Sequence, residues 1–435
     1  MNSTACGLIL ALMFSASTAV ADTLPDGILS LYKDLHANPE LSFQEKKTSA
    51  RMAAELEALG FSVIRNIGGY GVAGVFEHGP GPTVLIRADM DALPVKEATG
   101  FAFASKQVAD ISPGQSVPVM HACGHDVHMA NWVGTAKTLL ARKDEWSGTL
   151  VFIAQPAEER GAGARAMLGD GLYKRVPLPD YNLALHVGAS LPAGMVATTS
   201  GYALANVDTV DIYVKGVGGH GAYPHTTKDP IVLASKIVMA LQTLVSRELS
   251  PLEPGVVTVG AFNAGSKHNV ISDEAHLQLT VRSFSEEARA LLLNGIKRIA
   301  HGEALAAGLP EDKLPKVDIN EEHTPSVYND PALTERVMAA LVDTLGADNV
   351  ISTAPVMGGE DFAEYGRTKE DIPGLIFWLG AVNPETFKSA KVAGTTLPSL
   401  HSPFFAPDYE LTLKTGIKAM TSAALELLAK RGVAE

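Results

Sequence analysis

The sequence contains very little cysteine. Only Cys6 and Cys123 occur in 435 residues. Residues 1–21 carry no charged side chain, are apolar from Leu8 to Phe14, and end in the small-x-small pattern Ala19-Val20-Ala21, which is typical of a cleaved secretory signal. We therefore expect export to the periplasm of a mature chain with one cysteine, which excludes an internal disulfide. The alternative is a retained membrane anchor, because the segment lacks the usual basic residue ahead of its apolar run.

Positive charge is also scarce. The chain has 35 lysine and arginine residues against 48 aspartate and glutamate residues, a formal net charge of −13. The expected signal has no charged side chain, so the mature chain keeps this charge. Such a chain offers no extended basic surface to nucleic acid or anionic lipid. We predict a small-molecule ligand, no nucleic-acid partner, and no stable membrane insertion after the signal is removed.

Apolar runs that end abruptly in polar residues predict a mostly parallel sheet. The segments "PTVLIRADMD", "GTLVFIAQPAEE" and "YNLALHV" are each typical of a buried strand followed at once by charged or imidazole side chains. Helical periodicity separates them, which indicates an α/β fold. Such sheets carry their sites beyond the carboxyl ends of the strands. We therefore expect the polar residues after these strands to meet.

The pattern changes between residues 206 and 317. Alternating strands such as "VDTVDIYVKG" and two amphipathic helices, at 230–247 and 285–307, replace the buried strands there. We predict a smaller inserted α+β domain in which two helices pack on a four-stranded, largely antiparallel sheet. The larger domain is then formed by residues 22–205 and 318–435.

Cys123 lies two residues before His125 in the stretch "MHACGHDVHMA". Thiolate and imidazole at this spacing suit a borderline-soft divalent ion, and coordination explains how a lone thiol survives in an oxidising compartment. Two alternatives stay open. Cys123 is a nucleophile activated by a histidine with Asp126 as the orienting group, or it is a small buried side chain. His121 and His128 are more typical of supporting residues than of ligands.

Adjacent carboxylates in "QPAEER" form a second candidate site. Of Glu158 and Glu159, one can bind a cation while the other holds a proton, if their surroundings separate the two pKa values. His186 ends an apolar strand and His401 stands in "LHSPFF". Each is a candidate ligand, although each taken alone is more typical of a structural histidine. Asp89 and Asp91, in "RADMDALP", offer a carboxylate that can orient a metal-bound histidine.

Other residues are suited to binding a substrate. His220 lies among glycines in "GVGGHGAYPH", where the backbone can approach a ligand closely. Asn269 and Arg282 can bind an amide or carboxylate oxygen, the alternative for Arg282 being a surface salt bridge. The loop "MGGEDF", with Gly359, Glu360 and Asp361, is a further candidate and forms either a substrate rim or a helix N-cap.

Eight strings, in order along the chain, resemble the co-catalytic metallopeptidase family of glutamate carboxypeptidase and aminoacylase: "LHANPELSFQE", "RADMDALP", "MHACGHDVH", "QPAEE", "GGHGAYPH", "HNVISD", "GGEDF" and "LHSPFF". The greatest similarity is to the branch of hippurate hydrolases, N-acyl-amino-acid amidohydrolases and indole-acetyl-amino-acid hydrolases. The resemblance implies a catalytic domain with an inserted lid and dimerisation domain, and a homodimer or higher homo-oligomer. It also implies two divalent ions per subunit, of manganese, zinc, cobalt or nickel.

The resemblance implies a role for each candidate of the metal site. Glu158 becomes the general base and Asp91 the aspartate that orients the site. Other branches of the family have a ligand histidine at the position of Asp89. The resemblance therefore leaves open whether the metal ion that this histidine binds is present here. The implied metal ligands are Cys123, His125, Glu159, His186 and His401.

The resemblance also implies roles on the substrate side. His220 matches a lid-domain histidine that meets the substrate carbonyl, often across a dimer interface. Asn269 and Arg282 match the pair that meets the carboxylate end of the substrate, and Gly359 belongs to the binding rim.

The expected function is hydrolysis of the amide bond of N-acyl amino acids or short acyl-peptides by metal-activated water. The alternative from another class is a periplasmic binding protein that clamps a metal or an acyl-amino acid without turnover. Such a protein has no use for the base Glu158 beside a ligand glutamate. A cysteine hydrolase is the third possibility.

Overall fold

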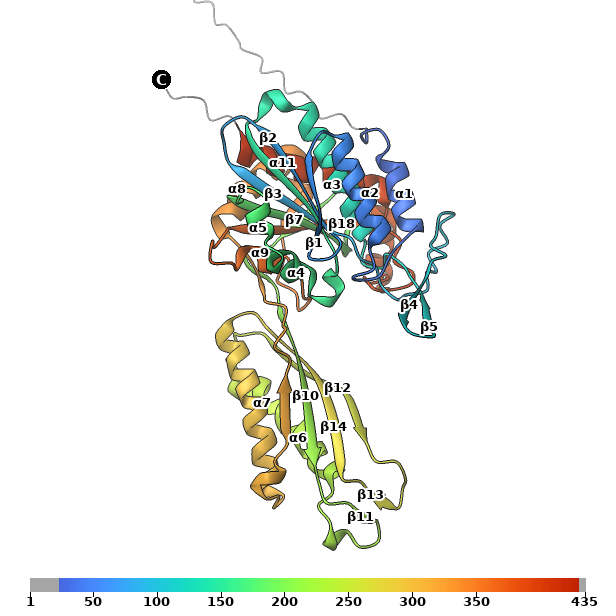
Figure 1. Ribbon diagram of the computed structural model, residues 1–435, viewed down its shortest axis with the longest axis vertical. Coiled ribbons are helices and arrows are strands. Elements are labelled where there is room, and N and C mark those ends of the chain that lie inside the picture. The colour runs from blue at the N-terminus through green and yellow to red at the C-terminus, as the bar shows by residue number, and fades with distance from the viewer. Residues whose placement is uncertain (1–22, 430–435) are drawn as a thin grey trace, which may run out of the picture.

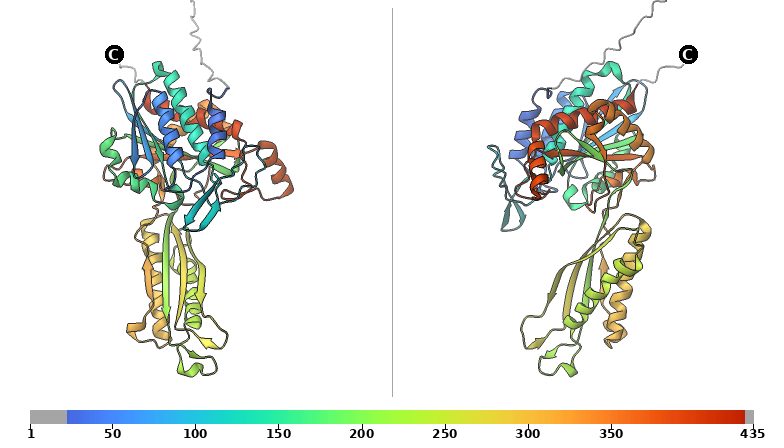
Figure 2. Two further views of the ribbon diagram at one scale, coloured as in Figure 1. Left: turned by 45° about the vertical axis from the view of Figure 1, so that its right-hand side comes forward. Right: turned by 180° about the vertical axis from the view of Figure 1, so that it is seen from behind.

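The computed structural model describes residues 23–429, so the expected signal at residues 1–21 lies outside the described residues. A larger α/β domain stands at the top of Figure 1, and an elongated α+β domain hangs below it. Figure 2 shows from two further sides that the second domain extends away from the first. The predicted fold class, an α/β domain with a smaller α+β insertion, is confirmed.

The larger domain is built on an eight-stranded sheet in the order β1-β2-β6-β3-β7-β18-β8-β17. The four central strands, β6, β3, β7 and β18, are parallel, whereas β1, β2 and β8 pair antiparallel to their inner neighbours. In chain order the strands are β1 (Ser62–Ile67), β2 (Gly71–His78), β3 (Thr83–Asp89), β6 (Gly148–Gln155), β7 (Tyr181–Pro192), β8 (Val196–Thr198), β17 (Val350–Ser352) and β18 (Gly374–Val382).

Helices cover both faces of this sheet. Side chains alternate along β3, so that Val84 and Ile86 pack on one face and Leu85 on the other. The first face is covered by α1 (Ile28–Ala37), α2 (Lys46–Ala58), α3 (His125–Ala141), α8 (Pro331–Leu345) and α11 (Tyr409–Leu428). The second face is covered by shorter helices, α4 (Gly163–Gly169), α5 (Leu172–Arg175) and α9 (Ala363–Gly366).

The inserted domain has a four-stranded antiparallel sheet in the order β12-β14-β10-β15. Its strands are β10 (Asn206–Lys215), β12 (Gly255–Ala264), β14 (Glu274–Ser283) and β15 (Lys316–Ile319). Two helices, α6 (Pro230–Thr243) and α7 (Glu286–Ala306), bury their apolar sides against it. A small ribbon of β11 (Gly219–His220) and β13 (Val270–Ile271) lies at the end far from the α/β domain (Figure 1).

One helix within the described residues is long and apolar enough to cross a membrane, Pro230–Glu248, with a mean hydropathy of 1.3. It consists of α6 and a short π-helical continuation, Leu244–Glu248. Leu233, Ile237 and Leu241 are buried on the inserted sheet. Packing of a core-facing helix therefore accounts for part of its apolar character.

Three smaller features complete the chain. Strands β9 (Gly201–Leu204) and β16 (Val327–Asn329) pair where the chain passes between the domains. The hairpin of β4 (Val108–Ser112) and β5 (Gln115–Pro118) projects from the α/β domain, and the sequence pattern did not predict it. Helix α10 (Pro384–Ala393) precedes the loop that carries His401.

Close packing of α3 on α11 gives a test of the core. A Cβ atom on Gly134 would overlap Cδ1 of Ile417, so we expect Gly134→Ala to lower the free energy of unfolding by about 1–3 kcal/mol. Ile417→Val removes the nearer of the two overlapped atoms, Cδ1, and the double variant should lose less than the sum of the two single changes. Chemical denaturation measures all three.

Gly302 provides the control for this test, since a Cβ atom there meets nothing within 4 Å. Gly302→Ala, at an exposed position near the end of α7, should stabilise the protein by roughly 0.5–1 kcal/mol. Additive losses for Gly134→Ala and Ile417→Val would contradict the packing described here.

Candidate metal centre

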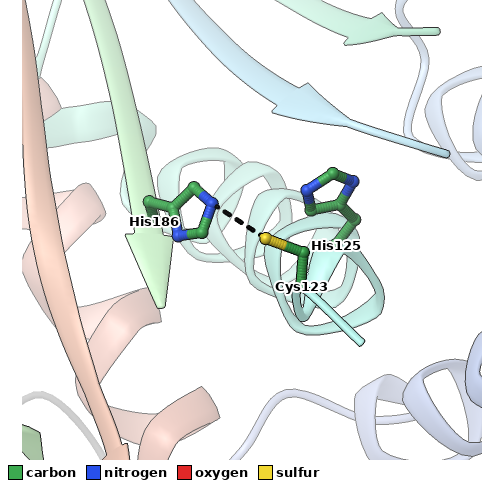
Figure 3. A group of neighbouring side chains, drawn as sticks. All are labelled: Cys123, His125 and His186. Carbon is green, nitrogen blue, oxygen red and sulfur yellow. Dashed lines mark hydrogen bonds between the residues drawn. The ribbon is translucent and has the colours of Figure 1, made fainter. Parts of the chain in front are cut away.

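Polar side chains from distant parts of the chain converge beyond the carboxyl ends of the central strands. Cys123 and His125 stand at the start of α3, where Gly124 adopts a left-handed backbone. His186 comes from β7 and faces Cys123, as Figure 3 shows. Glu158 and Glu159 lie in a 3-10 turn, Glu158–Arg160, that follows β6. The polar residues that follow these strands therefore meet at this edge of the sheet, as predicted.

The possible ligand atoms are separated by distances that suit a shared cation. Cys123 Sγ is 3.5 Å from His186 Nε2 and 3.3 Å from His401 Nε2. His401 Nε2 is 3.4 Å from Glu159 Oε1, and His125 Nε2 is 3.9 Å from the same oxygen. Two ligands of one tetrahedral ion, each about 2.0–2.3 Å from it, lie about 3.3–3.8 Å apart.

The hydrogen bonding of these atoms also fits a metal. Both ring nitrogens of His125 and Oε1 of Glu159 are buried and have no hydrogen-bond partner among the described residues. Buried polar atoms are rarely left unpaired without a ligand or water to satisfy them. Cys123 belongs to two groups that could each hold an ion, one with His125 and His186 and one with Glu159 and His401. The residues therefore fit two neighbouring ions with the thiolate between them.

Electrostatics at the cluster show why a cation belongs there. Burial raises the pKa of the Cys123 thiol, and the carboxylates of Glu159 and Glu158 raise it further. Burial and the charges of Glu360 and Glu159 raise the pKa of Glu158 well above its usual range, and burial raises that of Glu159 to about 7. Without a positive ion, the charged forms of these side chains are disfavoured.

Asp91 contacts both the turn that carries Glu158 and Glu159 and the side chain of His125. Its Oδ1 accepts a hydrogen bond from the backbone N–H of Glu158 (3.1 Å), and its Oδ2 accepts one from Glu159 (3.0 Å). Ser42 Oγ also donates to Oδ2, at 2.6 Å. Asp91 Oδ1 lies 3.3 Å from His125 Nδ1, which directs the other ring nitrogen, Nε2, toward the cluster.

Asp89 is engaged by other side chains. Arg87 Nη1 donates to Oδ2 and His128 Nδ1 donates to Oδ1, both at 2.6 Å. His128 Nε2 accepts the backbone N–H of Val187 at 2.9 Å, so both of its nitrogens are used. Both side chains are thus engaged by hydrogen bonds, although with His125 they also form a group whose ligand atoms lie close enough together to hold an ion. The supporting role of His128 stays a prediction.

Arg87 lies at the centre of a buried network that the sequence did not reveal. Besides Asp89, its guanidinium donates to Glu360 Oε1 at 2.8 Å and Asp361 Oδ1 at 3.2 Å. All four side chains are almost fully buried. Glu360 and Asp361, expected in a substrate rim or a helix cap, are therefore structural partners of this arginine.

A cleft of about 440 Å³ opens onto the cluster. Its lining includes ligand candidates, both glutamates and the apolar side chains of Leu204, Val207, Trp378 and Leu400. Arg282 and Gly359, two of the predicted substrate-binding residues, also line it. Arg282 reaches it from the near end of the inserted sheet and donates from Nη1 to the carbonyl of Met357 at 2.6 Å.

His220 and Asn269 are not brought to this cleft within the chain. They lie at the far tip of the inserted domain, where the backbone N–H of Gly221 donates to the carbonyl of Asn269 at 2.9 Å. Both are exposed. Asn269 and Arg282 therefore stand at opposite ends of the inserted sheet and do not act as one pair in a single subunit.

A second buried group behind the cluster was also missed. His36 Nδ1 is 2.6 Å from Asp126 Oδ2, and His36 Nε2 is 2.9 Å from Glu97 Oε1. Burial lowers the pKa of His36, but the hydrogen bonds to Asp126 and Glu97 outweigh it and raise the pKa to about 9. The imidazolium therefore holds Asp126, which directly follows His125. The string "LHANPELSFQE", which contains His36 and resembles the family, was the one feature of the sequence that pointed to this group.

Residues 85–426 match the model of a protein family that is described as "Peptidase family M20/M25/M40". The chain belongs to this family. The enzyme prediction is confirmed, and so is the resemblance inferred from the sequence.

Named relatives cover almost the whole chain. Thermostable carboxypeptidase 2 of Saccharolobus solfataricus is 35% identical over 407 residues, which span 93% of this chain and 96% of the relative. IAA-amino acid hydrolase ILR1-like 4 of Arabidopsis thaliana is 35% identical over 386 residues, 89% of this chain and 82% of the relative. A crystal structure of a dinuclear metal-binding M20 peptidase of Bacillus subtilis has a TM-score of 0.73 and 32% identity, and covers 92% of this chain and 97% of that one.

Metal binding should release protons. Burial lowers the pKa of His125, but the charge of Asp89 and the contact with Asp91 outweigh it and raise the pKa to about 10. Near pH 7 the metal-free protein therefore holds protons on His125 and Cys123, and part of one on Glu159, that a metal must displace, on the order of two to three per chain. Metal affinity should accordingly rise as the pH is raised from 6 toward 8. Calorimetric titration in buffers of different ionisation enthalpy measures the number released.

Cys123→Ser is the matched variant for this experiment, because it removes the thiol proton and keeps the size of the side chain nearly unchanged. It should release about one proton fewer than the original protein. Heats of binding that do not depend on the buffer would contradict the protonation states described here.

Proposed function

We propose that this protein is a metal-dependent amidohydrolase that cleaves the amide bond of N-acyl amino acids or short acyl-peptides with a free carboxylate. One observation carries the proposal. The cleft contains a buried set of unpartnered ligand atoms, a second glutamate beside that set, and an arginine facing the same space. Hydrolysis of an amide next to a carboxylate needs these three components.

The proposed ligands of two divalent ions are Cys123, His125, Glu159, His186 and His401. Manganese, zinc, cobalt and nickel all suit such a mixture of thiolate, imidazole and carboxylate. When bound, the ions lower the pKa of water and offset the negative charge that develops on the carbonyl oxygen. The dinuclear peptidase from Bacillus subtilis supports two ions rather than one.

Glu158 is the proposed general base. It borders the ligand cluster, with Oε2 3.8 Å from His125 Nε2, and it lines the cleft. Burial and the neighbouring carboxylates raise its pKa, so it accepts a proton more readily than an ordinary glutamate. In the proposed reaction Glu158 takes a proton from the attacking water and passes it to the leaving amine.

Arg282 and Gly359 form the proposed substrate rim. Only Nη1 of Arg282 is occupied by a short hydrogen bond, to Met357, which leaves donors for a carboxylate. A Cβ atom on Gly359 would meet Val207 of the inserted domain, so glycine lets the rim loop approach the domain junction. The apolar side chains of Trp378 and Leu400 are suited to the acyl group.

His220 and Asn269 are proposed to act in the cleft of a second subunit. The backbone N–H of Ala222 donates to Nδ1 of His220 at 3.0 Å, so a neutral ring carries its proton on Nε2. His220 is exposed, so that proton is available to a substrate oxygen. We therefore propose a homodimer or higher homo-oligomer as the active form.

The cysteine-hydrolase alternative is not favoured by the geometry. A nucleophilic cysteine needs a lowered pKa, whereas burial raises that of Cys123. Asp126, which that alternative uses to orient a histidine beside the cysteine, is bound to His36. A binding protein without turnover is not favoured either, given membership of a peptidase family.

Export is part of the proposal. The charge-free segment at residues 1–21 and its small-x-small end support a cleaved signal and a periplasmic location. A mature N-terminus at Asp22 on the purified periplasmic protein is the expected result.

A substrate panel tests the function. N-acetyl, N-benzoyl, indole-acetyl and long-chain acyl amino acids are assayed with each of the four metals, beside carboxamide analogues that lack the free acid. Glu158→Gln should keep its metal content and lose about 10³-fold or more in kcat. Glu159→Gln, one residue away, should lose metal as well as activity.

Equal inactivity of the original protein across the panel would refute the proposed function. Near-full activity of Glu158→Gln would show that another group is the base.

Mixing two inactive variants tests the shared site. Glu158→Gln and His220→Ala are each expected to be nearly inactive. If His220 acts across the interface, a mixed dimer has one intact site, and random exchange of subunits restores about a quarter of the original activity. No recovery after confirmed subunit exchange would place His220 in the cleft of its own chain or outside the reaction.

A further inference from the structure

The glutamate turn after β6 has an unusual backbone. Ala157, the residue before Glu158, has φ 52°, in the left-handed region that a residue with a Cβ atom seldom adopts. It begins the 3-10 turn that carries both the proposed base and a proposed ligand. Something outside the turn must therefore hold this conformation.

Glu45 makes the contact that does so. Its Oε1 accepts the backbone N–H of Ala157 at 2.8 Å, across 112 residues of sequence. The same oxygen accepts the backbone N–H of Phe43 at 2.9 Å, and Phe43 is also left-handed, with φ 60°. The side chain of Glu45 is fully buried, and its other oxygen has no partner among the described residues. Oε1 is therefore the atom through which Glu45 acts on the turn.

Three successive N–H groups of the turn are held by two carboxyl groups. Glu45 accepts from Ala157, and Asp91 accepts from Glu158 and Glu159. Ser42, three residues before Glu45, donates to Asp91. The segment Ser42–Glu45 thus supports the turn in two ways. Glu45 accepts a hydrogen bond from the turn directly, and Ser42 donates to Asp91, whose carboxylate also holds the turn.

We infer that Glu45 is a positioning residue for the proposed hydrolysis: its buried carboxyl group fixes the turn at Ala157 and so sets the placement of Glu158 and Glu159. The inference rests on the proposed roles of those two glutamates. In this role Glu45 needs only an oxygen atom that accepts a hydrogen bond at the position of Oε1. It does not need a negative charge. Glutamine, which keeps the oxygen and the shape, should therefore replace it.

The test compares three variants of Glu45. Glu45→Gln should keep metal affinity and kcat within about threefold of the original. Glu45→Leu keeps the volume but removes the acceptor, and should weaken metal affinity and lower kcat by about 10–100-fold each. KM should change much less, because no substrate contact is lost.

Glu45→Asp serves where the leucine variant does not fold. Aspartate keeps the charge, but its shorter side chain withdraws the oxygen from Ala157. The expected order for both metal affinity and kcat is glutamine above aspartate. The reverse order would overturn the inference, because it would show that charge matters and the position of the acceptor does not.

Glu40 is the matched control. It also accepts two backbone N–H groups, those of Lys47 and Thr48, each at 2.8 Å, but at the start of α2. Glu40→Leu should lower the melting temperature and leave metal affinity and kcat within about threefold. Equal losses of metal affinity in Glu40→Leu and Glu45→Leu would reduce Glu45 to a general structural role and overturn the inference.

Metal affinity is measured by equilibrium dialysis without substrate, so this experiment does not depend on turnover. If the original protein hydrolyses nothing in the substrate panel, the proposed function fails while the metal readout still decides whether Glu45 positions Glu159.

Discussion

Burial of negative charge is the constraint on which the catalytic domain depends. Ionised carboxylates removed from water are unfavourable unless a positive partner and hydrogen bonds compensate for the lost hydration. Arg87 supplies that compensation for Asp89, Glu360 and Asp361. A second set, Cys123 with Glu158 and Glu159, makes no ion pair with an arginine among the described residues, and burial raises its pKa values. Burial raises the pKa of Asp361 to about 7 as well, so the ion pairs with Arg87, and not the pKa values, distinguish the structural charge network from the proposed metal centre.

Topology brings the two sets together. Parallel strands place their carboxyl ends at one edge, so the residues after β3 and β6 meet the start of α3 and His186 of β7. Backbone N–H groups then fix the geometry, as in the turn held by Asp91. The inserted domain contributes Arg282 at its near end and carries His220 to its far tip. In the proposed shared site, the tip that carries His220 reaches the cleft of a second chain.

Much of this arrangement could be predicted from short-range patterns. Abrupt ends of apolar runs located the edge of the sheet, and alternation identified the inserted domain, whose two helices begin and end close to the expected residues. The predicted ligands Cys123, His125, Glu159, His186 and His401 lie together, although their roles stay predictions. Asp91 was expected to orient a histidine, and its contacts with two backbone N–H groups add a second task.

The features that could not be predicted depend on contacts between residues far apart in the sequence, which produce no local sequence pattern. Glu45 looks like an ordinary polar residue ahead of α2, and its partner Ala157 is 112 positions away. His36 and Glu97 meet Asp126 in the same long-range manner. The resemblance implied that Asn269 and Arg282 act as a pair, but β14 runs between them and separates them along its length. Periodicity describes one element at a time, and these relations join several.

Anomalous scattering from crystals grown with manganese tests the central claim most directly, because it locates the ions without reference to activity. Two peaks are expected, each about 2.2–2.6 Å from Cys123 Sγ, with the remaining ligands divided between them. A single peak away from Cys123, or no peak in the cleft at saturating manganese, would contradict the account of a metal centre bridged by Cys123.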